Sequence, residues 1–236
     1  MFSESAEIYD LIYAGFKNYA EESTKLAALL RHLHPTCRSV LDVACGTGEH
    51  VRYLTNDHGF RVDGLDLNRR FLDIAAQKNP GSRFWEADMA AFDLPRRYDA
   101  IVCLFSSIGY LCTLDRVTCA LRCFGRHIAD GGIIVVEPWF APGQLDPSYV
   151  MRNTAEAKGL LIDRVSHTEI DGRLSRLRFD YRLTDATGVR TATEVHELGL
   201  FTPAEMLTTF VAAGLQVEYD ERGLDGRGLY VARIAA

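Results

Sequence analysis

The chain has 236 residues, 47% hydrophobic and 25% charged, which suits one α/β domain with an elaboration. Its net charge is −6, whereas a nucleic-acid binder is typically basic. No apolar run approaches the ~18–20 residues of a transmembrane helix. The acidic start, Met1–Glu7, has neither the cationic beginning nor the apolar centre of a signal peptide.

The cysteines indicate the compartment. There are six, mostly inside apolar runs, which is typical of reduced core thiols in a cytoplasmic protein. Cys119 and Cys123 lie four apart on a predicted helix, and the chain has no C-x-x-C pair. We therefore expect no metal site.

Helices and strands alternate through the first 138 residues. The predicted helices cover residues 20–33, 49–56, 69–78 and 115–128, and the predicted strands cover residues 39–44, 61–67, 83–86, 98–105 and 133–138. We expect the last of these helices to stop at Gly131-Gly132. Such a rhythm predicts a doubly wound parallel sheet with its ligand cleft at the carboxyl ends of the strands.

Residues 139–200 break this alternation. Leu177, Phe179, Tyr181 and Leu183 alternate with charged residues, as in a half-buried strand. Similar runs at 160–170 and 189–200 are separated from it by turn signals, which predicts a three-stranded antiparallel insertion after the fifth strand. The insertion is either a solubilising surface sheet or a substrate-binding wall over the cleft, and its length favours the wall.

The end of the chain returns to the α/β rhythm. A helix at 203–213 and strands at 215–220 and 228–234 bring the main sheet to seven strands. Residues 1–138 and 201–236 are thus expected to form one Rossmann-like domain, and residues 139–200 the inserted one.

The segment Ser39-Val-Leu-Asp-Val-Ala-Cys-Gly-Thr-Gly48 carries the first chemical signal. A strand that gives way to tiny residues and then to a helix brings bare backbone against a ligand. The dinucleotide fingerprint would need a third glycine where Val51 stands, and a P-loop would need a lysine where Glu49 stands. The pattern instead resembles motif I of the class I S-adenosylmethionine (AdoMet) methyltransferases.

Two acidic residues at later strand ends support the same interpretation. Asp66 ends the second strand, where Rossmann-type sites hold ribose hydroxyls for either NAD or AdoMet. Asp88 and Met89 follow the third strand. In methyltransferases of this class, an acidic side chain at this position accepts a hydrogen bond from the adenine amine, and the backbone N–H of the next residue faces the adenine ring. Alone, Asp88 would more often be a helix N-cap, but after this glycine run the methyltransferase interpretation is favoured.

Four further stretches resemble one branch of that class, the nucleotide-amino-sugar N,N-dimethyltransferases of the desosamine and mycaminose type. They are Phe105-Ser-Ser-Ile-Gly109, Val135-Val-Glu-Pro-Trp139, Arg164-Val-Ser-His167 and Gly226-Arg-Gly-Leu229. The resemblance runs nearly from end to end and implies a sheet whose last strand is antiparallel. It also implies that AdoMet meets Tyr9, Tyr19, Ala44, Gly46, Asp66, Asp88, Met89 and Leu104, and that a dTDP-sugar meets Arg164, Val165, Ser166, His167, Thr168 and Arg227.

The residue chemistry agrees with the acceptor part of this assignment. Arginine clasps a pyrophosphate bidentately, which suits Arg164 and Arg227, and Trp139 could stack on a base or a sugar. Without the resemblance, each arginine could equally be a solvated surface charge, and His167 a structural histidine.

The chain departs from the family at two positions on the acceptor side. Tyr110 stands where the family commonly has a histidine close to the amine, and Phe2 replaces an N-terminal tyrosine that caps the active site. We predict that Tyr110, the candidate catalytic residue, orients the amine, because a phenol with a pKa of about 10 is a poor base at pH 7.

The predicted function is N-methylation of a small-molecule amine, and the resemblance implies a dTDP-linked amino-deoxysugar of natural-product biosynthesis. The alternatives are another small-molecule or peptide amine or hydroxyl acceptor, an NAD-dependent oxidoreductase, and a non-catalytic AdoMet-fold protein. The expected partners are AdoMet and the small-molecule substrate, with neither nucleic acid nor membrane and with a possible homodimer.

Overall fold

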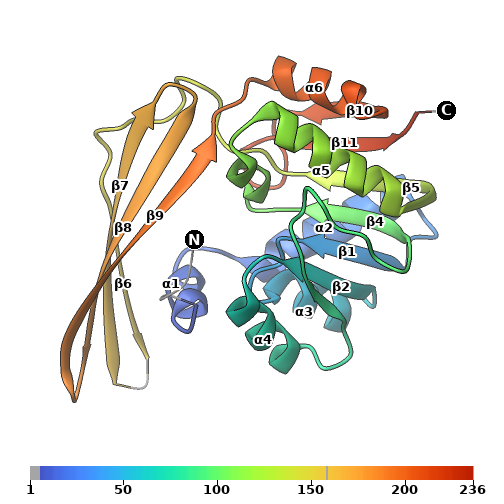
Figure 1. The fold of residues 1–236 in the computed structure, drawn as a ribbon. Helices are drawn as coiled ribbons and strands as arrows, with labels where there is room; N and C mark the ends of the chain where they lie inside the picture. The colour runs from blue at the N-terminus through green and yellow to red at the C-terminus, as the bar shows by residue number, and fades with distance from the viewer. Residues whose placement is uncertain (1–5, 158, 236) are drawn as a thin grey trace.

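Two β-sheets with a short helix between them make up the molecule (Figure 1). The computed structural model describes residues 6–157 and 159–235. The larger sheet has seven strands in the order β10-β11-β5-β4-β1-β2-β3, and the smaller sheet has four in the order β6-β7-β8-β9. The predicted doubly wound α/β fold with an antiparallel insertion is confirmed.

The strands of the larger sheet are mostly parallel. They are β1 (Ser39–Val43), β2 (Arg61–Asp66), β3 (Phe84–Glu86), β4 (Tyr98–Cys103), β5 (Ile128–Val136), β10 (Leu215–Asp220) and β11 (Leu229–Ile234). Only β11 runs antiparallel to its neighbours β5 and β10, as the family resemblance implied. The central strands β1 and β4 are buried along almost their whole length, because helices cover both faces of the sheet.

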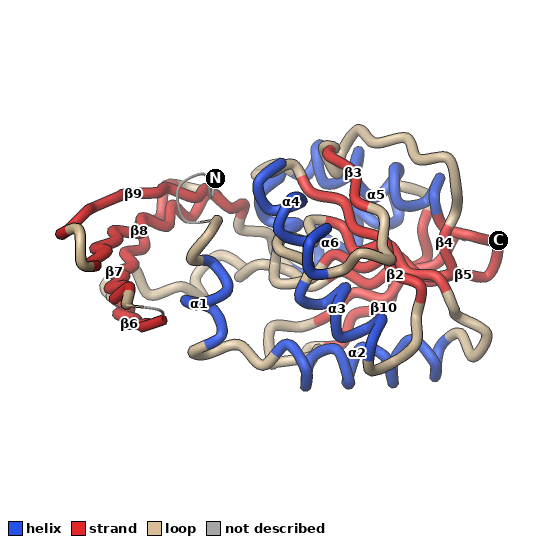
Figure 2. Tube along the Cα trace, turned by 90° about the horizontal axis from the view of Figure 1, so that it is seen from below, coloured by secondary structure: helices blue, strands red, loops and turns tan. Residues whose placement is uncertain are grey.

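The helices divide between the two faces of this sheet. They are α1 (Tyr9–Ala14), α2 (Tyr19–Leu33), α3 (Glu49–Asn56), α4 (Arg69–Lys78), α5 (Leu114–His127), α6 (Pro203–Ala212) and the 3₁₀ turn η1 (Ser107–Leu111). One core cluster packs α2 and α3 against the sheet, and the other packs α5 and α6 (Figure 2). Short α1 instead contacts β6 and lies between the two sheets.

One boundary differs from its prediction. Helix α5 ends at His127 and β5 begins directly at Ile128, so Gly131-Gly132 lie inside the strand and do not stop the helix. Ile128 is fully buried and pairs with Tyr98 on β4, so strand pairing starts before the glycines. Tertiary packing overrides the local stop signal here.

The smaller sheet has four strands, not the predicted three. They are β6 (Met151–Ala157), β7 (Leu160–Asp171), β8 (Leu174–Asp185) and β9 (Gly188–Gly199), all antiparallel. The missed strand β6 is an edge strand of sequence MRNTAEA, which lacks the apolar alternation that marks a half-buried strand.

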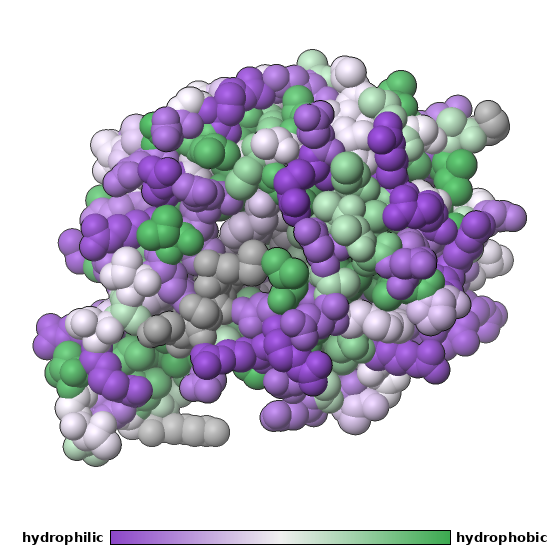
Figure 3. Space-filling model, viewed as in Figure 1, coloured by the Kyte–Doolittle hydropathy of each residue, from purple (hydrophilic) through white to green (hydrophobic). Residues whose placement is uncertain are grey.

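The outer surface gives no strong functional signal. Hydrophilic side chains predominate on the face in Figure 3, with apolar residues scattered among them. Within the described ranges, no helix has both the length and the apolar character needed to span a membrane.

Candidate active site

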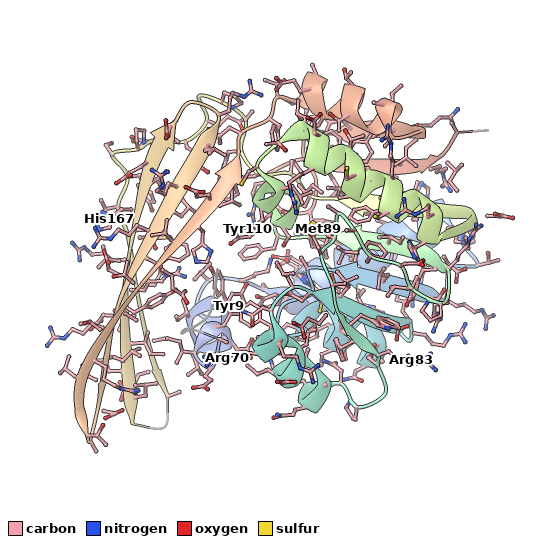
Figure 4. The ribbon with its side chains drawn as sticks, in the orientation of Figure 1. Tyr9, Arg70, Arg83, Met89, Tyr110 and His167 are labelled. Atoms are coloured by element: carbon pink, nitrogen blue, oxygen red, sulfur yellow. The ribbon has the colours of Figure 1, made fainter. Side chains whose placement is uncertain are left out.

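A cavity of about 570 Å³ lies between the carboxyl ends of the larger sheet's strands and the inner face of the smaller sheet. Its lining brings together residues from every part of the chain. The predicted site residues that line it are Tyr9, Ala44, Gly46, Asp66, Asp88, Met89, Tyr110, Trp139, Arg164, Ser166, Thr168 and Arg227. Figure 4 shows Tyr9 on α1, Met89 in the turn after β3 and Tyr110 on η1 directed toward this space.

Left-handed backbone shapes the turn after β1. Ala44 and Gly46 have φ angles of 59° and 56°, and Gly48, with a φ of 76°, caps α3. Alanine rarely adopts this conformation, so the turn is strained at the point where it lines the cavity. Such strain is typical of a functional site.

Asp66 holds this turn in place. Its Oδ2 accepts the Gly46 N–H at 2.8 Å, and its Oδ1 accepts the Asn68 N–H at 2.8 Å. Burial raises the pKa of Asp66, while these two hydrogen bonds oppose the shift. A carboxylate has about four lone-pair directions, so Asp66 can still accept from a ligand's hydroxyls.

Asp88 lies farther along the same edge of the sheet. It accepts hydrogen bonds from the Ala90 N–H at 2.9 Å and from Arg116 Nη2 at 2.8 Å. Burial opposes ionisation, but these two donors outweigh it and lower the pKa of Asp88. An ionised acceptor therefore faces the cavity next to Met89.

Two predicted cofactor residues lie outside the cavity lining. Leu104 is buried in the core cluster beneath α2 and α3. Tyr19 packs edge-on against His50 with ring centroids 5.0 Å apart. Neither lines the cavity, and their contact with a cofactor stays a prediction.

The acceptor end of the cavity contains a buried guanidinium. Arg164 on β7 is 3% exposed and packs over the rings of Tyr13, Phe16 and Phe179. Its Nη2 donates to Asn153 Oδ1 at 3.0 Å, whereas Nε and Nη1 have no hydrogen-bond partner among the described residues. Ser166 Oγ, on the same face of β7, has none either.

Strand alternation places two predicted neighbours of Arg164 on the other face of β7. Arg164, Ser166 and Thr168 line the cavity, so Val165 and His167 lie on the opposite face of the sheet. His167 points outward in Figure 4, and its Nε2 lies 3.9 Å from Asp180 Oδ2. Neither side chain lines the cavity, and contact of these two residues with the substrate stays a prediction.

Arg227 differs from Arg164 in being paired. It forms ion pairs with Asp225 and, at 3.5 Å, with Glu137, and its Nη1 lies 3.3 Å from Ser106 Oγ. Burial disfavours its charge, but these carboxylates outweigh burial and raise its pKa. Burial raises the pKa of Glu137 to about 7, and Arg227 opposes that shift.

Lys17 and Phe105 were missed from the sequence. The Lys17 ammonium lies 3.9 Å from the centroid of the Phe105 ring, and the Arg227 guanidinium lies 5.2 Å from it. Two cations thus share one aromatic ring that lines the cavity. Residues 17, 105 and 227 meet only in the folded chain, so no local motif could have revealed this cluster, although Phe105 and Arg227 each lie in a stretch that resembles the family.

Trp139 and Tyr110 are both anchored from the smaller sheet. Trp139 Nε1 donates to Ser175 Oγ at 2.8 Å, which fixes the indole at the cavity wall. Tyr110 Oη lies 3.1 Å from Nδ1 of His196, and burial raises the pKa of the phenol well above its usual value. Phe2, predicted to replace the family's capping tyrosine, lies outside the described residues.

Comparisons with known proteins agree with this geometry. Residues 40–132 match the family model described as a methyltransferase domain. The chain is 42% identical over 229 residues to dTDP-3-amino-3,6-dideoxy-alpha-D-glucopyranose N,N-dimethyltransferase of Streptomyces fradiae, covering 96% of this chain and 89% of the relative. It is 39% identical to the dTDP-3-amino-3,4,6-trideoxy-alpha-D-glucopyranose N,N-dimethyltransferase of Streptomyces venezuelae, covering 97% of each.

Solved structures show the same likeness. The crystal structure of Streptomyces venezuelae DesVI superposes with a TM-score of 0.91 at 38% identity and covers 100% of both chains. The SAM-bound structure of CalS10, an amino pentose methyltransferase from Micromonospora echinaspora, superposes with a TM-score of 0.85 at 35% identity and covers 95% of both.

Proposed function

The chain belongs to the AdoMet-dependent methyltransferases, in the family of the dTDP-amino-deoxysugar N,N-dimethyltransferases, and from this membership we propose that it methylates the amine of a dTDP-linked 3-amino-deoxysugar. The two relatives at 42% and 39% identity are named for 3-amino sugars, and the one at 35% for a 4-amino sugar. The 3-amino class is therefore the first choice.

The observation that carries the substrate proposal is the buried Arg164 guanidinium, of which only Nη2 has a hydrogen-bond partner among the described residues. Burying a charge is expensive unless a partner compensates, and here two nitrogen donors lack one among the described residues. An anionic ligand in the cavity would supply it. A pyrophosphate suits Arg164 because its oxygens match the planar fork of a guanidinium.

Arg227, Ser166 and Thr168 extend this proposed anion-binding region along the cavity wall. Arg227 already has two carboxylate partners, so it gains less from a ligand than Arg164 does. Trp139 offers its indole face to the base or the sugar. We assign residues 139–200 as the substrate-binding insertion and residues 1–138 and 201–236 as the cofactor-binding domain.

The other end of the cavity suits AdoMet. The proposed contacts are Asp66 with the ribose hydroxyls, Asp88 with the adenine amine, and Ala44 and Gly46 with the rest of the cofactor through their backbone. Tyr9 and Met89 line the same end. AdoMet supplies an activated methyl group on a sulfonium, so the protein needs no metal or covalent nucleophile for the transfer.

The chain's own contribution is to hold the acceptor nitrogen in line with that methyl group and to exclude water. Orientation of this kind supplies up to roughly 7–11 kcal/mol in well-aligned systems. The cavity lining supports this role, because Tyr110 lines the same cavity as Arg164 and Met89.

Mass spectrometry of the products tests the proposal. The purified protein is incubated with AdoMet and four acceptors: a dTDP-3-amino-deoxysugar, its 4-amino isomer, the 3-hydroxy analogue and the free 3-amino sugar without its nucleotide. We expect one or two added methyl groups on the 3-amino nucleotide sugar and none on the hydroxy analogue. Methylation of the free sugar alone, or of none of the amines, would overturn the assignment.

A further inference from the structure

A buried chain of three polar residues leads away from the active-site cavity. Tyr110 on η1 lines the cavity, and its Oη lies 3.1 Å from Nδ1 of His196 on β9. On the other side of the imidazole, Nε2 lies 3.8 Å from Oε2 of Glu194. The side chains of His196 and Glu194 are 0% and 3% exposed, and neither lines the cavity.

We propose that His196 is a positioning residue which, with Glu194, turns the Tyr110 hydroxyl into a hydrogen-bond acceptor for the substrate amine. The proposal rests on the N-methyltransferase function proposed above. His196 acts only through Tyr110, because the phenol separates the imidazole from the cavity.

The direction of the Tyr110–His196 hydrogen bond depends on the imidazole tautomer. The partner of one ring nitrogen sets which nitrogen carries the proton. The Glu194 carboxylate lies 3.8 Å from Nε2, too far for a hydrogen bond, but its negative charge favours the tautomer with the proton on Nε2. Nδ1 then has a lone pair and accepts, and the phenol must donate.

Among the described residues, charged and titratable groups face His196 from three elements: Glu194 on its own strand, Arg164 on β7 and Tyr110 on η1. Burial lowers the pKa of His196, the cation on Arg164 acts in the same direction, and Glu194 partly offsets both. The imidazole is therefore neutral at pH 7 and can accept the phenol's hydrogen.

Tight packing keeps η1 beside β9. At Gly109, a Cβ atom would lie 3.0 Å from Cβ of Trp139 and 3.1 Å from Cδ2 of Leu198, closer than side chains normally approach. The Phe179 ring also packs on the imidazole, with centroids 4.9 Å apart. Tyr110 is thus held at a fixed distance from His196.

This direction matters for methyl transfer. A phenol has one hydrogen, and while it is donated to Nδ1 the oxygen lone pairs remain to accept an N–H from the cavity. An amine bound in this way keeps its lone pair for the methyl group. If the phenol donated to the amine nitrogen, it would occupy the lone pair that must attack.

The step balances without a base at Tyr110. The nitrogen lone pair forms the N–C bond while the C–S bond breaks and its electron pair returns to sulfur, so the positive charge passes from sulfur to nitrogen. The N–H to Oη hydrogen bond strengthens as that charge develops. The surplus proton leaves the methylated amine for solvent afterwards.

Kinetics of His196 variants test the proposal. We expect His196→Ala to lower kcat roughly 10- to 100-fold, the loss of one hydrogen bond to a charged group, with AdoMet affinity unchanged. His196→Asn should restore most of the rate, because its side-chain oxygen can take the place of Nδ1. When Tyr110 is already Phe, adding His196→Ala should lower kcat by less than about threefold further, because the two changes remove the same hydrogen bond. If the kcat loss of the double variant instead equals the product of the two single losses, the proposal is overturned.

A nitrogen-15 NMR spectrum of histidine-labelled protein tests the tautomer without any activity. The His196 signals, identified by their loss in His196→Asn, should show a protonated Nε2 and an unprotonated Nδ1 in the wild-type protein. A protonated Nδ1 would overturn the proposal even if the enzyme methylates amino sugars. If no amine is methylated, the proposed function fails, while this spectrum still decides the tautomer.

Discussion

The two ends of the active-site cavity differ in how their polar groups are satisfied before any ligand binds. At the cofactor end, Asp66 and Asp88 already accept hydrogen bonds from backbone N–H groups, and Asp66 fixes the strained turn after β1. At the acceptor end, Arg164 and Ser166 have atoms without a hydrogen-bond partner among the described residues.

The difference indicates two ways of building a site. The cofactor end is preorganised by its own backbone, so a ligand adds contacts to a complete network. The acceptor end carries buried polar atoms that a ligand would complete, which makes its binding more dependent on the right partner. Changes at the first end should alter stability and cofactor affinity, and changes at the second should alter acceptor recognition alone.

Asp42 is an exception at the cofactor end, because one of its buried oxygens has no hydrogen-bond partner among the described residues. Its replacement should have the largest effect of the changes considered, and the effect is on the free energy of unfolding. It lies on β1 behind the cofactor end, its Oδ2 has no described partner, and burial together with nearby Asp66 raises its pKa to about 8. Between pH 4 and 8 the folded protein keeps this proton while the unfolded chain has lost it. Stability therefore falls as pH rises through that window.

The variant Asp42→Asn does not titrate and should escape this loss. Its unfolding free energy relative to wild type should increase between pH 4 and 8 by on the order of 5 kcal/mol and then stay constant. Urea unfolding of both proteins at pH 5, 7 and 8.5 measures the difference. A difference that does not change with pH would show that Asp42 is ionised in the folded protein.

Asp66→Ala tests the preorganised end. Loss of a hydrogen-bonded charged group should weaken AdoMet binding by roughly 1.5–3 kcal/mol, because both the proposed ribose contact and the anchor of the Gly46 turn disappear. Calorimetry with AdoMet measures this, with thermal unfolding as the control for folding. Unchanged affinity in a folded variant would contradict the assignment.

Alanine variants of Ser166 and His167, neighbours on β7, form a matched pair. Their expected effect on acceptor binding is the smallest of the changes considered. Ser166→Ala removes a buried hydroxyl that faces the cavity and should weaken acceptor binding by about 0.5–1.5 kcal/mol. His167→Ala, on the outer face, should change it by less than about 0.5 kcal/mol. Acceptor KM values for the two variants compare the cavity face and the outer face of β7. A larger effect at His167 would show that the outer face binds the acceptor.

The same comparison explains what the sequence could predict. Ala44, Gly46, Asp66, Asp88 and Met89 lie in local motifs at the ends of successive strands, and all five line the cavity as expected. Parallel strands bring their carboxyl ends to one edge, so position along the chain translates directly into position in the site.

The acceptor end does not follow from local motifs. Lys17, Glu194 and His196 meet it through packing between distant segments, and none of them stood out in the sequence. The family resemblance implies contacts by the whole run Arg164–Thr168, whereas strand alternation directs only every second side chain to the cavity. Edge strand β6 was missed because its own sequence lacks an apolar pattern.

The most direct test of the account is calorimetric titration of Arg164→Met with a dTDP-3-amino-deoxysugar and, separately, with AdoMet. The matched control is Arg178→Met, the same change on the exposed outer face of the adjacent strand, where Arg178 pairs with Asp180. We predict that Arg164→Met weakens nucleotide-sugar binding by about 1.5–3 kcal/mol and leaves AdoMet binding unchanged, while Arg178→Met alters neither. Unchanged nucleotide-sugar affinity in a folded Arg164→Met variant, or a loss of AdoMet binding instead, would contradict the account.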